Sequence, residues 1–330
     1  MSDVPKTDNR SHRQGIGEAT QVVASLWFSV GKETLSVISL QAAKSHRNER
    51  IAVNVLRGAA VFVIFAIAVL IVYLAFEGTK TFSVDKFPVW KFLFSSDYDP
   101  GNNLGGSAVF ITGTLLVTGF AIVVGGPFGI AVGVFLSEVA PARMAQILKP
   151  AIELLVGIPS VVYGWLGLTL LVPFLRTHTS SPSGFGLAAA GIVLSIMILP
   201  TVISLSEDAF RSLPVSLREG SMALGSTRWQ MITGVLLPSA SSGLTVALIL
   251  GIARAIGEAL AVQMVIGNSS QFPRGIFAPT ASLTTEIVID MGGAPQGSFQ
   301  EHVLFSMALL LLLIAMALIL LVRFALRGRG

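Results

Sequence analysis

Long runs of apolar residues alternate with short polar segments along most of this 330-residue chain. A helix needs about 20 predominantly apolar residues to cross the hydrocarbon core of a bilayer. We therefore expect an all-α, polytopic membrane protein with about six transmembrane helices, at Val53–Phe76, Ser107–Leu136, Ala151–Leu175, Leu187–Leu205, Leu237–Ile266 and Val303–Leu326.

The same pattern divides the chain into three sections. Residues 1–50 form a mostly hydrophilic N-terminal segment, residues 51–106 hold the first span and an outer loop, and residues 107–326 hold the other spans. Within the first section, we expect residues 1–13 to be disordered. Residues 22–40 are apolar but interrupted by charge, which favours a helix lying on the membrane surface over a span.

Composition supports the membrane assignment. The chain is 53% hydrophobic and only 12% charged, with a mean hydropathy of +0.77, whereas soluble domains contain about 25% charged residues. The net charge of +4 does not indicate a nucleic-acid partner, because the basic residues are distributed among the loops. The chain has no cysteine, so it forms no disulfide.

The distribution of lysine and arginine predicts the orientation. If the N-terminus is cytoplasmic, sixteen of the 22 basic residues lie in inside segments and five in outside segments, while Arg254 lies in a span. Inside loops of membrane proteins are enriched in these residues. Both termini and the polar loop 207–238 are therefore expected to be cytoplasmic.

This loop 207–238 is the longest internal polar segment with apolar runs on both sides. Ser216 and Glu219 have the spacing of a capping box, in which each side chain satisfies a backbone donor of the other residue. Gly225 follows where a helix end favours a residue that tolerates positive φ. The pattern therefore predicts two short helices that are joined at Gly225.

The second of these helices is expected at Thr227–Leu236, capped by Ser226 and ended by Pro238. A loop between membrane spans has little core of its own, so its large apolar side chains need cover from elsewhere. A partner surface would provide this cover. The side chains concerned are Met222, Leu224, Trp229 and Met231.

Two charged residues, Arg254 and Glu258, fall inside the predicted span Leu237–Ile266. Because they are four residues apart, they are expected to share one helix face. A central arginine costs about 2.5–3.5 kcal/mol in a bilayer, so its charge should face the protein interior or an aqueous path. The guanidinium offers paired donors to a tetrahedral oxyanion, and Glu258 would hold Arg254 when the path is empty. The residues alone leave open whether the pair forms a substrate path or only fixes two helices.

Two further patterns concern packing. Gly125, Gly129 and Gly133 recur every fourth residue, which predicts close approach of a neighbouring helix rather than ligand contact. The outer loop 267–302 contains residues 283–291, where Glu286 and Asp290 are four apart. This segment is either a short helix that caps the outer mouth or a solvated amphipathic turn.

Catalytic chemistry is not indicated. The sequence has no G-x-x-x-x-G-K-[ST] motif, so we do not expect this chain to hydrolyse ATP or to bind a nucleotide cofactor. The four histidines lack metal-ligand spacing, and no nucleophile and base can be paired. We therefore expect a transport subunit rather than an enzyme.

The loop 207–238 resembles the EAA loop of ABC-importer permeases. Glu219, Gly225, Leu237 and Pro238 match that pattern in type and spacing, while Gly220-Ser221 replace Ala-Ala and Val235 replaces Ile. The resemblance implies that this segment is a coupling helix that docks on a cytoplasmic ATPase subunit. The alternative is an ordinary hairpin between membrane helices.

A second resemblance is to PstC-type permeases of phosphate ABC importers. Residues 253–260, ARAIGEAL, are similar to their Ala-Arg-Ala-x-Gly-Glu-Thr signature, with Ala259 in place of Thr, and residues 148–164 are similar as well. The resemblance covers roughly residues 100–326 and implies a type I ABC importer permease fold. It also implies that Arg254 and Glu258 take part in phosphate passage, although the missing Thr leaves a hydroxyl contact there in doubt.

The partners implied by this resemblance are a PstA-like second permease subunit, two PstB-like ATPase subunits and an external phosphate-binding protein. The expected location is the bacterial cytoplasmic membrane. The nearest alternative is the same architecture for another oxyanion, such as sulfate or molybdate. A stand-alone anion channel or secondary carrier would have no ATPase to dock, and a membrane-bound enzyme would need a catalytic set.

Overall fold

The structure is a computed structural model that describes residues 53–179 and 181–327. The expectations for residues 1–13 and 22–40 lie outside these ranges. The chain forms two units, Met1–Ile71 and Val72–Gly330. A long apolar helix, Val53–Ser83, begins in the first unit and ends in the second, where its last turn is α2 (Lys80–Ser83).

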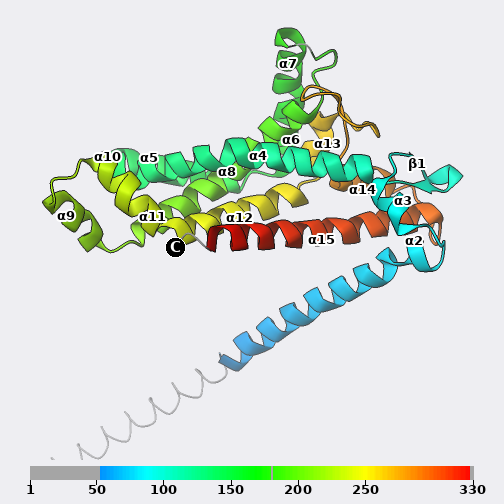
Figure 1. The fold of residues 1–330 in the computed structure, drawn as a ribbon, viewed down its shortest axis with the longest axis horizontal. Coiled ribbons are helices and arrows are strands. Elements are labelled where there is room, and N and C mark those ends of the chain that lie inside the picture. Colours follow the sequence, from blue (N-terminus) through cyan, green and yellow to red (C-terminus); the bar gives the residue numbers. More distant parts are fainter. Residues whose placement is uncertain (1–52, 180, 328–330) are drawn as a thin grey trace, which may run out of the picture. The chain divides into compact units, whose positions relative to one another are not determined.

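The described part of the second unit is almost entirely helical (Figure 1). A two-stranded antiparallel ribbon, β1 (Tyr98–Asp99) and β2 (Leu104–Gly105), encloses a 3-10 turn. The α-helices after α2 are α3 (Val89–Phe94), α4 (Ala108–Val134), α5 (Ala142–Val156), α6 (Ser160–Leu166), α7 (Val172–His178), α8 (Leu187–Arg211), α9 (Val215–Ala223), α10 (Arg228–Met231), α11 (Leu237–Ser239), α12 (Ser241–Gly257), α13 (Leu260–Ile266), α14 (Leu283–Asp290) and α15 (Phe299–Arg327). Three π-helical turns extend or join them: η2 (Phe135–Val139), η3 (Gly167–Leu171) and η4 (Ile232–Leu236).

The predicted number of spans is confirmed. Among the described residues, five helices are long and apolar enough to cross a membrane: Val53–Ser83, Ala108–Val139, Ser160–His178, Leu187–Arg211 and Phe299–Phe324. A sixth span arises if the pair Arg228–Ser239 and Ser241–Gly257, which is bent by 70°, is counted as one.

Two predicted spans are interrupted by breaks in the structure. The third does not start at Ala151, because α5 ends at Val156 and the spanning helix begins at Ser160. Pro159 explains the break, since a proline disfavours helical backbone in the residue before it. The fifth is not one helix to Ile266, because α12 ends at Gly257 and α13 begins at Leu260.

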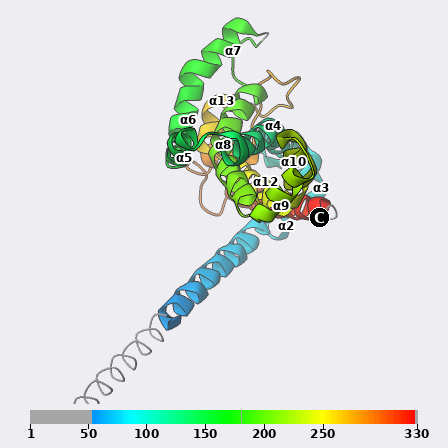
Figure 2. The ribbon, with the colours of Figure 1, turned by 90° about the vertical axis from the view of Figure 1, so that its left-hand side faces the viewer.

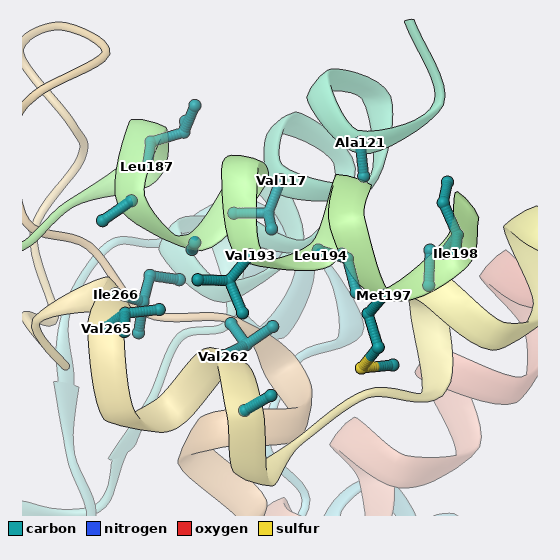
Figure 3. Close-up of a cluster of buried hydrophobic side chains, with 14 of the residues drawn as sticks. Val117, Ala121, Leu187, Val193, Leu194, Met197, Ile198, Val262, Val265 and Ile266 are labelled. Carbon is teal, nitrogen blue, oxygen red and sulfur yellow. The ribbon is translucent and has the colours of Figure 1, made fainter. Parts of the chain in front are cut away.

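The core of the second unit lies between α4, α8 and α13. Val117 and Ala121 of α4 pack against Leu194 and Ile198 of α8, and Val262 of α13 contributes to the same cluster (Figure 3). Helix α12 packs against α8 and α15, while α6 and α13 pack together. Both ribbon views show α7 extending away from these packed helices (Figures 1 and 2).

The glycine pattern of α4 packs as predicted. Gly125, Gly129 and Gly133 are all buried against α8. A Cβ atom at Gly129 would lie 2.8 Å from a Val202 side-chain carbon, and one at Gly133 would lie 2.7 Å from the Ser206 Cβ. These glycines therefore allow α4 and α8 to approach more closely than larger residues would permit.

The segment 283–291 is a packed helix and not a solvated turn. Ser282 and Thr285 form a capping box at the start of α14, whose first turn is buried. The Tyr98 hydroxyl donates to Asp290 Oδ2 at 2.8 Å. Burial and, secondarily, the nearby Asp290 carboxylate raise the pKa of Glu286 to about 7.

Candidate functional site

The chain breaks its helix at Glu258, between α12 and α13. The backbone of Glu258 is extended (φ −75°, ψ 121°), and its side chain turns to the start of α13, where Oε1 accepts from the Ala261 N–H at 3.1 Å. The Thr284 hydroxyl donates to the Glu258 carbonyl at 3.0 Å. A helix end leaves backbone groups without partners, and these two bonds supply partners at depth in an apolar region.

The break contradicts the expectation that Arg254 and Glu258 share one helix face. Glu258 lies beyond the last helical residue, and within the described ranges no ion pair joins the two side chains. Arg254 instead donates from Nη1 to the hydroxyl of Thr201 on α8 at 3.2 Å. The interpretation in which Glu258 holds Arg254 is therefore wrong for this conformation.

Thr201 was not found by sequence reasoning. It is 53 positions before Arg254 and follows Pro200 in the middle of α8. No motif marks it, and only the packing of α12 on α8 brings the two residues together. Its hydroxyl accepts a hydrogen bond from the Arg254 guanidinium. The family signature would place a hydroxyl at position 259, where this chain has alanine.

A small cavity lies beside the break, and half of the residues that line it are apolar. Its polar side chains come from α4, the α12–α13 junction and the start of α14, namely Thr114, Thr118, Glu258, Ser282 and Thr284. Thr114 also accepts from the Leu283 N–H at 2.9 Å. Glu258 thus lines the same cavity as these hydroxyl groups, and it forms no ion pair with Arg254 within the described residues.

The loop 207–238 begins later than predicted. Helix α8 continues to Arg211, and Glu207 is only 1% exposed within it. Lys149 of α5 lies 3.4 Å from one Glu207 carboxylate oxygen, and Arg211 Nε lies 2.7 Å from the other. These two cations explain how a carboxylate is accommodated there, since buried charges require partners.

Gly225 ends α9 as predicted, with φ +81°. The Gly225 N–H donates to the Met222 carbonyl at 3.0 Å and the Ser226 N–H to the Ser221 carbonyl at 3.4 Å. These bonds form a Schellman motif, which depends on left-handed backbone at the glycine. Two short helices therefore meet at Gly225, as the sequence indicated.

The predicted caps in this loop are wrong. Helix α9 begins at Val215 after Pro214 with no side-chain cap, so Ser216 lies inside its first turn and cannot form the box with Glu219. Thr227, not Ser226, caps α10, in a box with Gln230. Pro238 lies within α11, and the chain turns instead at Ala240 before α12.

Much of the apolar surface of the loop is uncovered. Leu224 is 91% exposed and Trp229 is 71% exposed, and Met222 is also exposed. Met231 differs from the prediction, because it packs into a cluster with Phe210, Ile232, Leu236, Ala240 and Leu244. Among the motif residues, Glu219, Leu237 and Pro238 are exposed on the same loop.

Comparisons with known proteins agree on the class of protein. Residues 125–328 match the protein family described as "Binding-protein-dependent transport system inner membrane component". The chain is 47% identical over 267 residues to "Probable ABC transporter permease protein YqgH" of Bacillus subtilis, covering 80% of this chain and 86% of that protein. It is 34% identical over 251 residues to "Phosphate transport system permease protein PstC" of Haemophilus influenzae, with 70% and 79% covered.

A further relative is the PstC protein of Pasteurella multocida, 32% identical over 274 residues, with 77% of this chain and 84% of that protein covered. Among solved structures, a bacterial alginate ABC transporter matches with a TM-score of 0.57 at 17% identity, covering 84% of this chain and 93% of that one. The MetNI methionine ABC transporter, in an inward-facing conformation, matches with a TM-score of 0.51 at 21% identity, with 67% and 96% covered. At such identities the likeness concerns the fold alone, and the predicted fold of type I ABC importer permeases is confirmed.

Proposed function

This chain belongs to the family of binding-protein-dependent transport system inner membrane components, and from that premise we propose that it imports inorganic phosphate. It is a permease subunit of an ABC importer, a multi-pass protein of the bacterial inner membrane. Phosphate is the proposed cargo because relatives at 32% and 34% identity are named phosphate permeases. The observation that carries the proposal is the placement of Arg254 in the membrane-spanning part, where no acidic side chain of the described residues pairs with it.

The hydrogen bonding of Arg254 supports a role in anion passage. A guanidinium has five N–H donors, and the only hydrogen bond of Arg254 within the described residues goes to the neutral hydroxyl of Thr201. A charge inside a membrane protein is costly unless it serves a site or a path. The remaining donors of Arg254 are suited to the oxygens of a passing phosphate.

Glu258 has a different part in the proposed path. Its carboxylate accepts a hydrogen bond at the start of α13 and lines the small cavity at the break. It is one residue from the end of α12, on which Arg254 lies. The two side chains form no ion pair in this conformation, so we propose that Glu258 weakens phosphate binding through its negative charge at a distance, since a translocated ion must leave.

The loop 207–238 is proposed as the docking surface for the ATPase. Glu219, Gly225, Leu237 and Pro238 match the family motif, and the exposed Leu224 lies in the same loop, as do Trp229 and Met222. The family implies ATPase and substrate-binding partners. The specific partners we propose are two PstB-like ATPases, a PstA-like second permease and an external phosphate-binding protein.

This assignment places the loop and both termini in the cytoplasm. The chain lacks cysteine, so a single introduced cysteine reports its own position. We expect Ser226→Cys to react with a membrane-impermeant maleimide only after the membrane is opened. Labelling of Cys at this position in intact cells would show that the loop lies outside and that the assigned orientation is wrong.

The experiment that tests the substrate uses the complete transporter reconstituted in vesicles with its binding protein and internal ATP. We expect ATP-dependent phosphate uptake that excess sulfate or molybdate leaves unchanged. Uptake of sulfate or molybdate with no uptake of phosphate would replace the proposed cargo. Omission of ATP is the matched control, because uptake that persists without ATP would indicate a channel or carrier.

A further inference from the structure

We propose that Arg218 and Glu138 form a mechanical joint through which the loop 207–238 moves the second and fourth spans together. Arg218 lies on α9, and Glu138 lies on η2 at the end of the second span, 80 positions earlier. The inference rests on the proposed docking of an ATPase on this loop. The experiments below can disprove the joint without disproving phosphate as the cargo, and they can disprove phosphate without disproving the joint.

The pair has the geometry of a strong, directional contact. Arg218 Nε donates to Glu138 Oε2 at 3.0 Å, and Nη2 donates to Oε1 at 2.6 Å. Such a bidentate arrangement fixes orientation as well as distance. The Glu138 side chain is only 5% exposed, and its hydrogen bonds raise the pKa of Arg218 above its ordinary value.

The same guanidinium also holds the end of α8, the fourth span. Nη1 donates to the Leu213 carbonyl at 3.0 Å and Nη2 to the Phe210 carbonyl at 2.8 Å. Carbonyls at a helix C-terminus lack partners within the helix. Arg218, in the first turns of α9, is therefore hydrogen-bonded to the ends of two spans.

The rest of α9 is attached less firmly than the second half of the loop. None of its residues is buried, although Leu217 packs, partly buried, against the cluster that contains Met231, Ile232 and Leu236. A displacement of α9 by a docked partner can therefore reach the spans through the apolar contact of Leu217 and through Arg218, the side chain of α9 that hydrogen-bonds to the ends of two spans. An ion pair that served only stability would not need to connect α9, η2 and the end of α8.

The displacement would continue from this joint to the proposed anion site. Helices α4 and α8 pack closely along Gly125, Gly129 and Gly133, so they are expected to move as one body. Helix α8 carries Thr201, which accepts a hydrogen bond from Arg254. A shift of α8 therefore changes the position of the hydroxyl that orients Arg254.

The functional test compares Arg218→Gln and Glu138→Gln in the reconstituted transporter. The readouts are complex assembly, ATP hydrolysis stimulated by the loaded binding protein, and phosphate uptake. We expect both variants to assemble and to hydrolyse ATP, while uptake per ATP falls about tenfold, within the usual range of coupling between sites. The double variant should be no worse than the more affected single variant, because one interaction is lost in all three.

The matched control is Arg143→Gln, which removes an exposed arginine of α5 that has no ion pair in the described part of the chain. It should leave uptake per ATP unchanged. An unchanged ratio in Arg218→Gln and Glu138→Gln would overturn the joint. Loss of assembly in both variants would also overturn it, since the pair would then be only a structural brace.

A second readout does not depend on the transported ion. Spin labels at Ser216→Cys on α9 and Ala131→Cys on α4 report whether the two elements move together in the assembled complex. With Arg218 present, we expect one narrow distance that is the same with and without ATP; Arg218→Gln should broaden or shift it. An identical narrow distribution in the variant would overturn the joint, whereas absent phosphate uptake in the wild type would overturn only the cargo.

Discussion

Arg218 and Arg254 lie in the two regions that carry the motifs of this chain, and their surroundings differ sharply. Arg218 makes four hydrogen bonds, two to a carboxylate and two to backbone carbonyls. Arg254 makes one, to the neutral hydroxyl of Thr201, within the part of the chain that the structure describes. Arg218 uses four of its five donors within the fold, whereas Arg254 keeps most of its donors.

This difference separates a structural charge from a charge available to a ligand. A carboxylate beside an arginine competes with an incoming anion, so Arg218 is poorly suited to bind one. Among the residues that the structure describes, Arg254 has no such competitor in contact, and its position in the membrane-spanning part makes an idle charge costly. Net charge and sequence motifs do not reveal this distinction, because it depends on which acceptors the fold brings within reach.

The largest effect is expected from Arg254→Ala. Hydrogen bonds to charged groups contribute about 1.5–3 kcal/mol each, so losing a bidentate contact should reduce uptake about a hundredfold or more. Complex assembly and ATPase association should remain, because Arg254 has no carboxylate partner in the described residues. Arg254→Lys should also be poor, since an ammonium cannot reproduce the paired geometry.

Phosphate uptake normalised to assembled complex is the deciding measurement for Arg254. Arg218→Gln is the informative companion, since it should lower uptake per ATP without altering the phosphate concentration at half-maximal uptake. Wild-type uptake by Arg254→Ala would remove this residue from the path. A higher half-saturating phosphate concentration in Arg218→Gln would erase the difference between the two arginines.

A smaller effect is expected from Gly225→Val in the loop. Its φ of +81° is a left-handed conformation, and a Cβ there would meet no neighbouring atom, so only backbone strain acts. Such strain costs on the order of 1–3 kcal/mol for a residue other than glycine. We expect up to a tenfold loss of ATP-dependent uptake with normal membrane insertion.

The matched control for Gly225 is Gly234→Val, in η4, where an added Cβ also meets nothing and φ is not positive. This variant should insert and transport nearly as the wild type does. Equal transport by the two valine variants would show that the left-handed turn is not needed for coupling. Pull-down of the ATPase by each variant separates a docking defect from a later one.

Thr201→Val should have a smaller effect again. The change keeps the shape of the side chain and removes the hydroxyl that accepts from Arg254. A hydrogen bond of this kind contributes about 0.5–1.5 kcal/mol, so its loss should raise the phosphate concentration at half-maximal uptake roughly three- to tenfold. Thr169→Val is the control, because the Thr169 hydroxyl bonds only to the Trp165 carbonyl of its own helix.

The sequence was sufficient for features set by local chemistry. The apolar runs predicted the spans, the glycines of α4 predicted a packing face, and Gly225 predicted the left-handed turn. Each depends on the residue type and its near neighbours along the chain. The cap predicted at Ser216 is wrong by a small margin, because α9 begins at Val215, one residue before that serine, with Pro214 in the N-cap position.

Contacts between distant segments could not be read in this way. Glu138 and Arg218 are 80 positions apart, and Thr201 and Arg254 are 53 apart, so no spacing rule connects them. The break at Glu258 was missed for a related reason. The apolar pattern continues through it, and its hydrogen bonds come partly from Thr284, 26 positions later.

Two buried carboxylates extend the comparison of the arginines to acids. Glu138 is paired with a guanidinium, whereas Glu286 on α14 is 6% exposed and has Asp290 nearby instead of a cation. Burial, followed by the charge of Asp290, raises the pKa of Glu286 from 4.5 to about 7. Protonation thus relieves a cost at Glu286, whereas Glu138 accepts two hydrogen bonds from the Arg218 guanidinium.

The raised pKa of Glu286 fixes the direction of its effect on stability. Below about pH 4.5 the group is neutral in both folded and unfolded states, so it carries no ionisation cost. As the pH rises from there through about 7, the unfolded state releases the proton first, and folding loses on the order of 1–3 kcal/mol. We therefore expect the wild type to be less thermally stable at pH 8 than at pH 5.5, and Glu286→Gln to reduce this difference. Glu153→Gln, an exposed acid of α5, should leave the difference intact; an equal pH dependence in Glu286→Gln and the wild type would mean that Glu286 ionises as freely as an exposed acid.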